Sequence, residues 1–169
     1  MNKDKKTVRL RAIEPEDLEM MYDLENDESL WNVGATNVPY SRFIIHEYIR
    51  QTTGDIYTDK QLRLMIEVEQ QVVGMIDLTA FDPRHNRAEV GIVIQQPFRH
   101  QGYATQALQQ LIDYSRNVLH IHQLYAYIAT DNDYSLQLFR KAGFIQTAVL
   151  KDWLCLGEKY SDACFMQFF

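Results

Sequence analysis

The fold of this chain is decided by one stretch, Glu89-Val-Gly-Ile-Val-Ile-Gln-Gln-Pro-Phe-Arg-His-Gln-Gly-Tyr-Ala-Thr105. It begins as an apolar strand over residues 88–95, breaks at Pro97, and passes through a basic turn that contains Gly102. An amphipathic helix follows, because apolar residues recur at three- and four-residue spacing as far as Leu119. The first N–H groups of such a helix have no partner within it and lie at the positive end of its dipole. The pattern therefore predicts a site for a phosphate-bearing ligand at residues 99–105.

The rest of the chain surrounds this stretch with alternating strands and short helices. Besides 88–95, the sequence predicts strands over 7–12, 61–69, 72–80, 123–129, 144–156 and 159–168. Besides the long helix, it predicts three helices: one over 14–28, one that starts at Ser41, and one over 134–141. The helix that starts at Ser41 is expected to end before a polar loop over 52–59. This helix is expected to bury Ile44, Ile45, Tyr48 and Ile49. We expect an α+β fold in a single domain, residues 1–169, with a mixed, mostly antiparallel sheet of about seven strands and about four helices.

Composition narrows the class of protein. The 169 residues are 46% hydrophobic and 24% charged, as in ordinary globular proteins. A net charge of −6 argues against nucleic-acid binding and is compatible with a cationic substrate. We expect a cytoplasmic protein without membrane attachment, since the sequence has no long apolar run and no signal peptide. No metal is expected, because the histidines form no ligand cluster. Cys155 and Cys164 lie in the hairpin predicted from strands 144–156 and 159–168 and could face each other there. We expect both to be reduced packing residues.

Three motifs carry a family resemblance. They are Arg99-His-Gln-Gly-Tyr-Ala104, Asn132-Asp-Tyr-Ser135 and Leu138-Phe-Arg-Lys-Ala-Gly-Phe144. The first resembles the Gln/Arg-x-x-Gly-x-Gly/Ala signature of the GNAT superfamily, the acetyl-coenzyme-A-dependent N-acetyltransferases. The other two resemble that superfamily's Asn-x-x-Ser and Lys-x-Gly-Phe segments. The similarity extends over nearly the whole chain and is greatest to the branch that contains ribosomal-protein-alanine and spermidine N-acetyltransferases.

The resemblance implies acetyl-CoA as co-substrate and indicates where it binds. The backbone amides of Gln101, Gly102, Tyr103 and Ala104, with Thr105 nearby, would hold its pyrophosphate. Arg99 and His100 would add positive charge there, although both also fit a solvated turn. The pantetheine arm would pair with main chain at Ile92, Val93 and Ile94, and Asn132 and Ser135 would face the same ligand. Asn132 also fits the simpler role of a helix cap.

Acetyl transfer requires a neutral amine, and Glu89 is the best candidate for its general base. Burial among the apolar residues of the strand should raise the pKa of this carboxyl toward working pH. The alternative is a carboxylate paired with Arg63, Arg84 or Arg87, and Asp77 is a second, weaker candidate base. A main-chain N–H near Ile94 would polarise the thioester carbonyl, as an oxyanion donor does.

The sequence departs from the family pattern at two places. Many members have a tyrosine acid where this chain has Phe139, which we expect to pack against the cofactor without donating a proton. Spermidine acetyltransferases have adjacent acids in the region that corresponds to residues 30–39, and this chain has no carboxylate there. The resemblance therefore does not imply that this chain has the same substrate as that subfamily.

We expect an N-acetyltransferase that moves an acetyl group from acetyl-CoA to a primary amine by direct attack on the thioester. The amine would be a polyamine-like small molecule or a peptide N-terminus. The alternative is a catalytically weak acyl-CoA-binding or regulatory module that lacks the usual tyrosine acid. The apolar C-terminal strand, which ends at Phe169, is expected to be an edge covered in a homo-oligomer, a dimer or larger.

Overall fold

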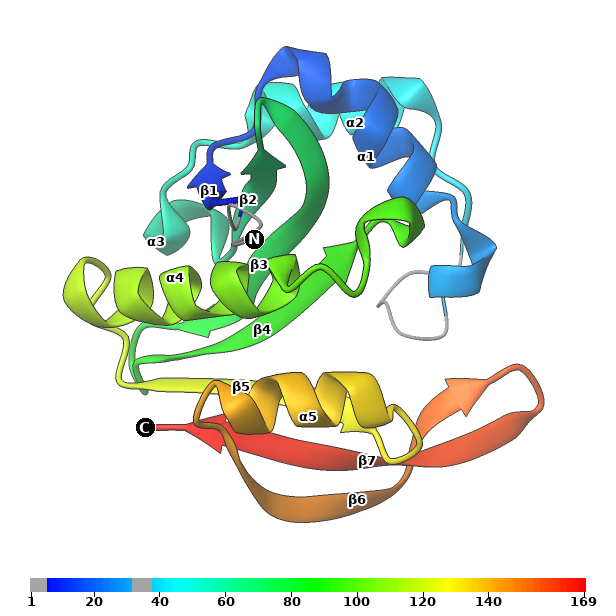
Figure 1. Cartoon of the computed structure of the whole chain (residues 1–169), viewed down its shortest axis with the longest axis vertical. Helices are drawn as coiled ribbons and strands as arrows, with labels where there is room; N and C mark the ends of the chain where they lie inside the picture. Colours follow the sequence, from blue (N-terminus) through cyan, green and yellow to red (C-terminus); the bar gives the residue numbers. More distant parts are fainter. Residues whose placement is uncertain (1–5, 32–37) are drawn as a thin grey trace, which may run out of the picture. The chain divides into compact units, whose positions relative to one another are not determined.

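The computed structural model describes residues 6–31 and 38–169, and these contain seven strands and five α-helices (Figure 1). The chain forms two compact units. Unit 1 comprises the segment up to Ile13 and Thr53–Leu124, and unit 2 comprises Glu14–Thr52 and Tyr125–Phe169. Most of the carboxylate-free region at 30–39 lies outside the described residues. None of the described helices has both the length and the apolar character needed to cross a membrane.

Unit 1 is built on an antiparallel meander. Its strands are ordered β1 (Val8–Arg11), β2 (Leu62–Val68), β3 (Gln71–Asp82) and β4 (Arg87–Ile94). Glu69 and Gln70 connect β2 to β3 with left-handed φ angles of 50° and 68°, the geometry of a tight hairpin turn. At the next hairpin, the Asp82 carboxylate accepts bonds from the backbone N–H groups of Arg84 and His85. Two short helices, α3 (Ile56–Asp59) and η3 (Gln96–Phe98), complete this unit together with α4.

The long helix α4 (Tyr103–Asn117) packs its apolar stripe on this meander, against β1, β3 and β4. Its buried residues are Tyr103, Ala107, Leu108, Leu111, Ile112 and Ser115. Two glutamines bind it to the edge strand β1: Val8 N–H donates to Gln106 Oε1 at 3.2 Å, and Gln110 Nε2 donates to the Val8 carbonyl at 2.8 Å. The predicted apolar face extended two residues too far, to Leu119, because the helix ends at Asn117 and Val118 is 59% exposed.

Unit 2 contains a pair of packed helices near the start of the chain. They are α1 (Leu18–Glu25) and α2 (Arg42–Gln51), and two short turns, η1 (Pro15–Asp17) and η2 (Glu28–Leu30), flank α1. The predicted helix over 14–28 is thus divided into three pieces. Arg42 joins the pair, since its guanidinium lies 4.0 Å from the centre of the Tyr22 ring and bonds the Glu19 carboxylate at 2.9 Å.

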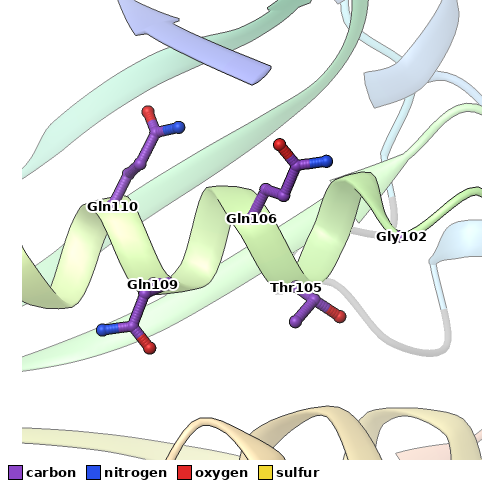
Figure 2. A pocket seen from close by; sticks show the side chains of 5 residues that line it. All are labelled: Gly102, Thr105, Gln106, Gln109 and Gln110. Carbon is purple, nitrogen blue, oxygen red and sulfur yellow. The ribbon is translucent and has the colours of Figure 1, made fainter. Parts of the chain in front are cut away.

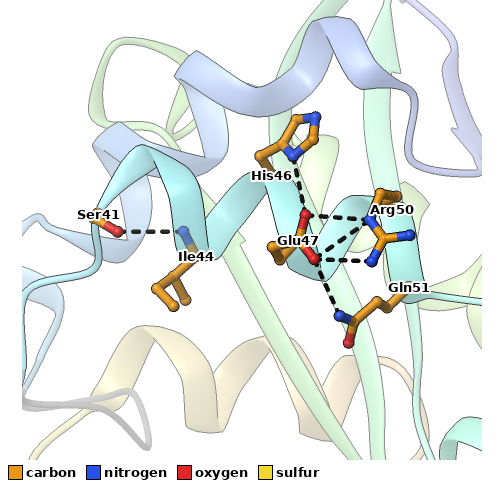
Figure 3. A network of polar contacts seen from close by, with 6 residues as sticks. All are labelled: Ser41, Ile44, His46, Glu47, Arg50 and Gln51. Carbon is orange, nitrogen blue, oxygen red and sulfur yellow. Dashed lines mark hydrogen bonds and ion pairs between the residues drawn. The ribbon is translucent and has the colours of Figure 1, made fainter.

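In helix α2, side chains bond the free backbone N–H at its start and one another near its end (Figure 3). Ser41 Oγ accepts from the Ile44 N–H at 3.2 Å, so the predicted cap is confirmed, and Glu47 accepts from Arg50 and Gln51. The predicted burial of Ile44 is wrong, because this side chain is 48% exposed. Ile45 is buried, whereas Tyr48 and Ile49 are only half-buried, so of the four residues predicted to be buried Ile45 alone lies in the core.

The second half of unit 2 contains β5 (Gln123–Ala129), α5 (Asp133–Lys141), β6 (Ile145–Leu156) and β7 (Lys159–Phe168). Its strands are ordered β5-β7-β6. The C-terminal strand β7 is therefore central and not an edge, which corrects the prediction, and its buried Ala163, Cys164 and Met166 fit that position. The edge is β6, whose residues 145–149 are all exposed. Both cysteines are free, and Cys155 lies opposite Tyr160 while Cys164 lies opposite Val149.

Candidate functional site

The turn between β4 and α4 has the geometry of an anion site. His100 and Gly102 both have left-handed φ angles, 62° and 80°, so the backbone folds sharply before the helix begins at Tyr103. A Cβ added to Gly102 would meet no heavy atom of the described residues within 4 Å, so it is the backbone angle that calls for glycine here. In the described structure no side chain caps the start of α4, and its first turn contains no acid. These N–H groups are therefore suited to an external anion.

The side chains of this turn divide into those that face solvent and those that hold the turn. Thr105, His100 and Gln101 are exposed, whereas Tyr103 is buried, so Tyr103 can offer a ligand little more than its backbone N–H. Gln101 Nε2 donates to the Pro97 carbonyl at 3.3 Å. Arg99 Nε donates to the Ile94 carbonyl at 3.0 Å, which ties the turn to the end of β4 and leaves the Nη groups for other acceptors.

A hollow of about 470 Å³ opens beside the first turns of α4 (Figure 2). It is lined by Gly102, Thr105, Gln106, Gln109 and Gln110. Gln106 and Gln110 point to the side where they bond β1, and Thr105 and Gln109 point to the opposite side of the helix. The hollow thus begins at the glycine of the turn and continues along the surface of α4 that carries the three glutamines.

Glu89 lies on β4, opposite Thr79 of β3, with a half-buried side chain. Loss of hydration raises the pKa of its carboxyl above the ordinary value of 4.5. Within residues 6–31 and 38–169 this carboxylate has no hydrogen-bond or ion-pair partner. Two of the three arginines that offered an alternative have other carboxylates: Arg87 lies 3.4 Å from Asp82, and Arg63 bonds Asp77.

The second candidate base, Asp77, is occupied by Arg63. Arg63 Nε and Nη2 donate to the two carboxylate oxygens at 2.9 and 2.8 Å, and both side chains are only 19% exposed. A carboxylate held in this bidentate manner is already engaged by the guanidinium and is less available to a substrate amine than one without such a partner. The arrangement favours Glu89 over Asp77 as a base, and the role of Glu89 stays a prediction.

The end of β4 lies beside a glycine of β3, Gly74, at which no side chain would fit. Ile92, Val93 and Ile94 lie opposite Ile76, Met75 and Gly74 of β3. A Cβ on Gly74 would lie 2.2 Å from the Val93 carbonyl oxygen. The sequence showed only a glycine inside a strand pattern, and that signal indicates a close backbone approach without saying to what.

The remaining predicted ligand residues belong to α5, in unit 2. Asn132 is the N-cap, and its Oδ1 accepts from the Ser135 N–H at 3.1 Å, so the capping role is confirmed. Phe139 is buried, and its ring meets the ring of Phe144 edge-on at 4.9 Å between centroids. Contact of Asn132, Ser135 or Phe139 with a cofactor stays a prediction.

Comparison with known proteins places residues 7–145 in a match to the acetyltransferase (GNAT) domain. The spermidine N(1)-acetyltransferase of Escherichia coli K12 is 28% identical over 163 residues, which cover 96% of this chain and 86% of that protein. The ribosomal-protein-serine acetyltransferase of the same organism is 25% identical over 161 residues, or 92% and 89% of the two chains. The Vibrio cholerae spermidine N-acetyltransferase, solved with CoA and spermine, has the same fold, with a TM-score of 0.84 at 24% identity over 96% of this chain and 95% of that one.

Proposed function

The chain belongs to the GNAT family of acetyltransferases and transfers an acetyl group from acetyl-CoA to an amine, and from this premise we propose that its amine is a small, polyamine-like molecule. We further propose that the turn before α4 holds the phosphates of the co-substrate and that Glu89 is the general base. The observation that carries this proposal is the place of Glu89: a half-buried carboxyl, without a hydrogen-bond or ion-pair partner among the described residues, on the strand that leads directly into that turn.

At the phosphate end, the proposal relies on the uncapped start of α4. The N–H groups of residues 101–105 would donate to phosphate oxygens, favoured by the helix dipole. The Arg99 Nη groups lie on the same turn and would add charge-assisted bonds while Nε keeps its bond to the Ile94 carbonyl. Among residues 6–31 and 38–169, no heavy atom lies within 4 Å of the place where a Cβ of Gly102 would be, which leaves room for a ligand to approach the backbone. The residues present therefore fit the group that the family implies.

At the reacting end, bound acetyl-CoA supplies an acetyl group activated as a thioester. The Glu89 carboxylate would accept the proton of the incoming ammonium or amine, because its raised pKa makes it a stronger base than an exposed glutamate. Phe139 has no proton to donate to the leaving sulfur. An ordinary thiol has a pKa of about 8.5, so the thiolate can leave without an acid of this kind.

The choice of amine has two supports. The net charge of −6 favours a cationic substrate, and the spermidine acetyltransferases of two bacteria match 90% or more of this chain. The carboxylate-free region at 30–39 means that the far ammonium group of a polyamine would have to be held by other acids. A peptide N-terminus is the second candidate, favoured by the similarity to the ribosomal-protein-serine acetyltransferase.

We also propose that the protein is a homo-oligomer. The exposed edge strand β6 offers unpaired backbone groups, and an edge of this length is normally covered or blunted. A relative of this fold, the V. cholerae spermidine N-acetyltransferase, is described as dodecameric. A monomer mass by light scattering at micromolar concentration would contradict this assignment.

The function is tested by following thiol release from acetyl-CoA with a panel of amines: spermidine, spermine, aminoglycosides and short peptides. We expect turnover with polyamines and a fall of roughly 100- to 10,000-fold in Glu89→Gln, the range of a lost general base. Glu158→Gln is the matched control, because this glutamate is exposed and lies in the β6–β7 turn. Tight CoA binding without release on any amine would instead support a binding module, and release on peptides alone would assign the second candidate.

A further inference from the structure

Gly74 occupies a place on β3 where no side chain fits. A Cβ built on it would lie 2.2 Å from the Val93 carbonyl oxygen and 3.1 Å from both Cα and Cδ1 of Ile94. The φ of Gly74 lies outside the left-handed region, so the requirement is for space and not for backbone freedom. The clashing oxygen is backbone, which cannot move aside as the end of a flexible side chain can.

This missing side chain sets the orientation of one peptide group. The Val93 carbonyl occupies the space beside Gly74, and therefore points toward β3. The Val93–Ile94 peptide bond is trans, so the N–H of Ile94 points the opposite way, off the far side of β4. Because both groups belong to one planar peptide unit, the position of the Val93 carbonyl fixes the direction of the Ile94 N–H.

The next peptide group is fixed at both ends. The Gln95 N–H donates to the Val73 carbonyl at 2.9 Å, and the Ile94 carbonyl accepts from Arg99 Nε at 3.0 Å. Ile94 therefore directs both of its backbone groups away from β3, with its carbonyl held by the guanidinium. The Val93 carbonyl beside Gly74 is the part of this segment that a side chain at residue 74 would displace.

We propose that Gly74 is a positioning residue for the transfer reaction: by leaving room for the Val93 carbonyl, it aims the Ile94 N–H at the thioester carbonyl. The proposal rests on the proposed function and on the expectation from the sequence that a main-chain N–H near Ile94 polarises that carbonyl. An alanine at this position would require the Val93 oxygen to move by about 1 Å, because Cβ contacts under about 3 Å do not occur. Such a movement rotates the peptide plane, and hydrogen bonds weaken steeply as they bend.

The experiment is infrared difference spectroscopy with acetyl-CoA labelled with ¹³C at the carbonyl, which needs no amine. In the wild-type protein we expect the bound carbonyl stretch to move to lower frequency, the sign of a donor on its oxygen. In Gly74→Ala we expect the stretch to return most of the way to that of free acetyl-CoA. With a working amine, kcat should fall about 10- to 100-fold, somewhat less than on complete loss of one such donor. The Kd of CoA, which has no acetyl group, should stay within about threefold.

Two controls keep the result interpretable. Gly91→Ala adds the same methyl to the same strand pair, but its nearest heavy atom is Asp77 Cβ at 3.9 Å, so the carbonyl stretch should match the wild type. If Gly74→Ala does not fold, the double variant Gly74→Ala/Ile94→Val removes the Cδ1 contact while keeping the clash with the carbonyl oxygen. It should fold and still lack the frequency shift.

Several outcomes would overturn the proposal. A folded Gly74→Ala with the wild-type carbonyl stretch and kcat would do so. A parallel loss of CoA affinity, melting temperature and kcat would also do so, because it would make Gly74 a packing residue only. A wild-type protein whose bound carbonyl is not shifted would remove the donor itself. If the shift is present but no polyamine is acetylated, the proposed substrate fails and the assignment of Gly74 stands.

Discussion

Helices α4 and α5 begin in opposite ways. At α5 the N-cap is Asn132, whose side chain accepts from the Ser135 N–H, and Asp133 places a negative charge in the first turn. At α4 the N-cap is Gly102 with a φ of 80°, no side-chain cap is present among the described residues, and the first turn has no acid. A cap is worth about 1 kcal/mol. The helix start that lacks this stabilisation is the one whose N–H groups remain available to a ligand.

Giving α4 a cap of its own should have the largest effect on ligand binding. In Gly102→Asp, a carboxylate at the helix start would repel phosphate and compete for the N–H groups, so acetyl-CoA affinity should fall about 100-fold by calorimetry. Gly54→Ala is the control for backbone strain, because Gly54 also has a left-handed φ, 71°, with nothing near its missing Cβ. Unchanged affinity in Gly102→Asp would mean that the phosphates bind elsewhere.

Removing the cap of α5 tests the other side of the comparison. Asn132→Ala should lower the free energy of unfolding by about 1 kcal/mol in a denaturant titration, because the Ser135 N–H loses its acceptor. Asn132→Ser keeps a cap and should recover most of this loss. If Asn132 also contacts the cofactor, both variants should bind acetyl-CoA several-fold more weakly; if capping is its whole role, neither should.

A smaller change is expected at Phe139, on the buried side of α5. Phe139→Tyr adds a hydroxyl that can serve as the acid the family usually has, so kcat should rise a few-fold and CoA affinity should change modestly. The measurement is steady-state turnover with the best amine of the panel, together with a binding titration. If affinity and turnover are both indifferent to this hydroxyl, Phe139 does not lie against the cofactor.

The smallest effect is a dependence of stability on pH at Glu89. Because the folded-state pKa of this carboxyl is raised, the folded protein holds its proton more tightly than the unfolded chain does. Stability is therefore lost as pH rises from the ordinary glutamate value to the raised one. Glu89→Gln does not titrate at this position. The melting temperature of the variant minus that of the wild type should therefore increase as pH rises through this window. At pH 7 the variant should melt at the same temperature as the wild type or higher. A gain that shrinks with rising pH would mean that Glu89 is paired.

Local features of this protein were readable from the sequence. The strand–turn–helix stretch, the caps at Ser41 and Asn132, and the hairpin around Gly157 all depend on residues only a few positions apart. The periodicity of α2 was legible too, but the sequence did not say which isoleucines face the core. Ile44 and Ile45 differ by about 100° around the helix axis, and only the packing partner distinguishes them.

What the sequence by itself determined is the family motif and the phosphate turn, because glycine, helix periodicity and chain proximity act locally. The tertiary structure decided which carboxylate has an arginine partner: Arg63 bonds Asp77 from the neighbouring strand, and Glu89 has no such partner in the part of the chain that the structure describes. It also decided that β7 is central and β6 the edge, and that Gly74 lies beside the Val93 carbonyl. These facts depend on pairing between residues distant in the chain, whose register is set by the sum of many contacts and by no single residue.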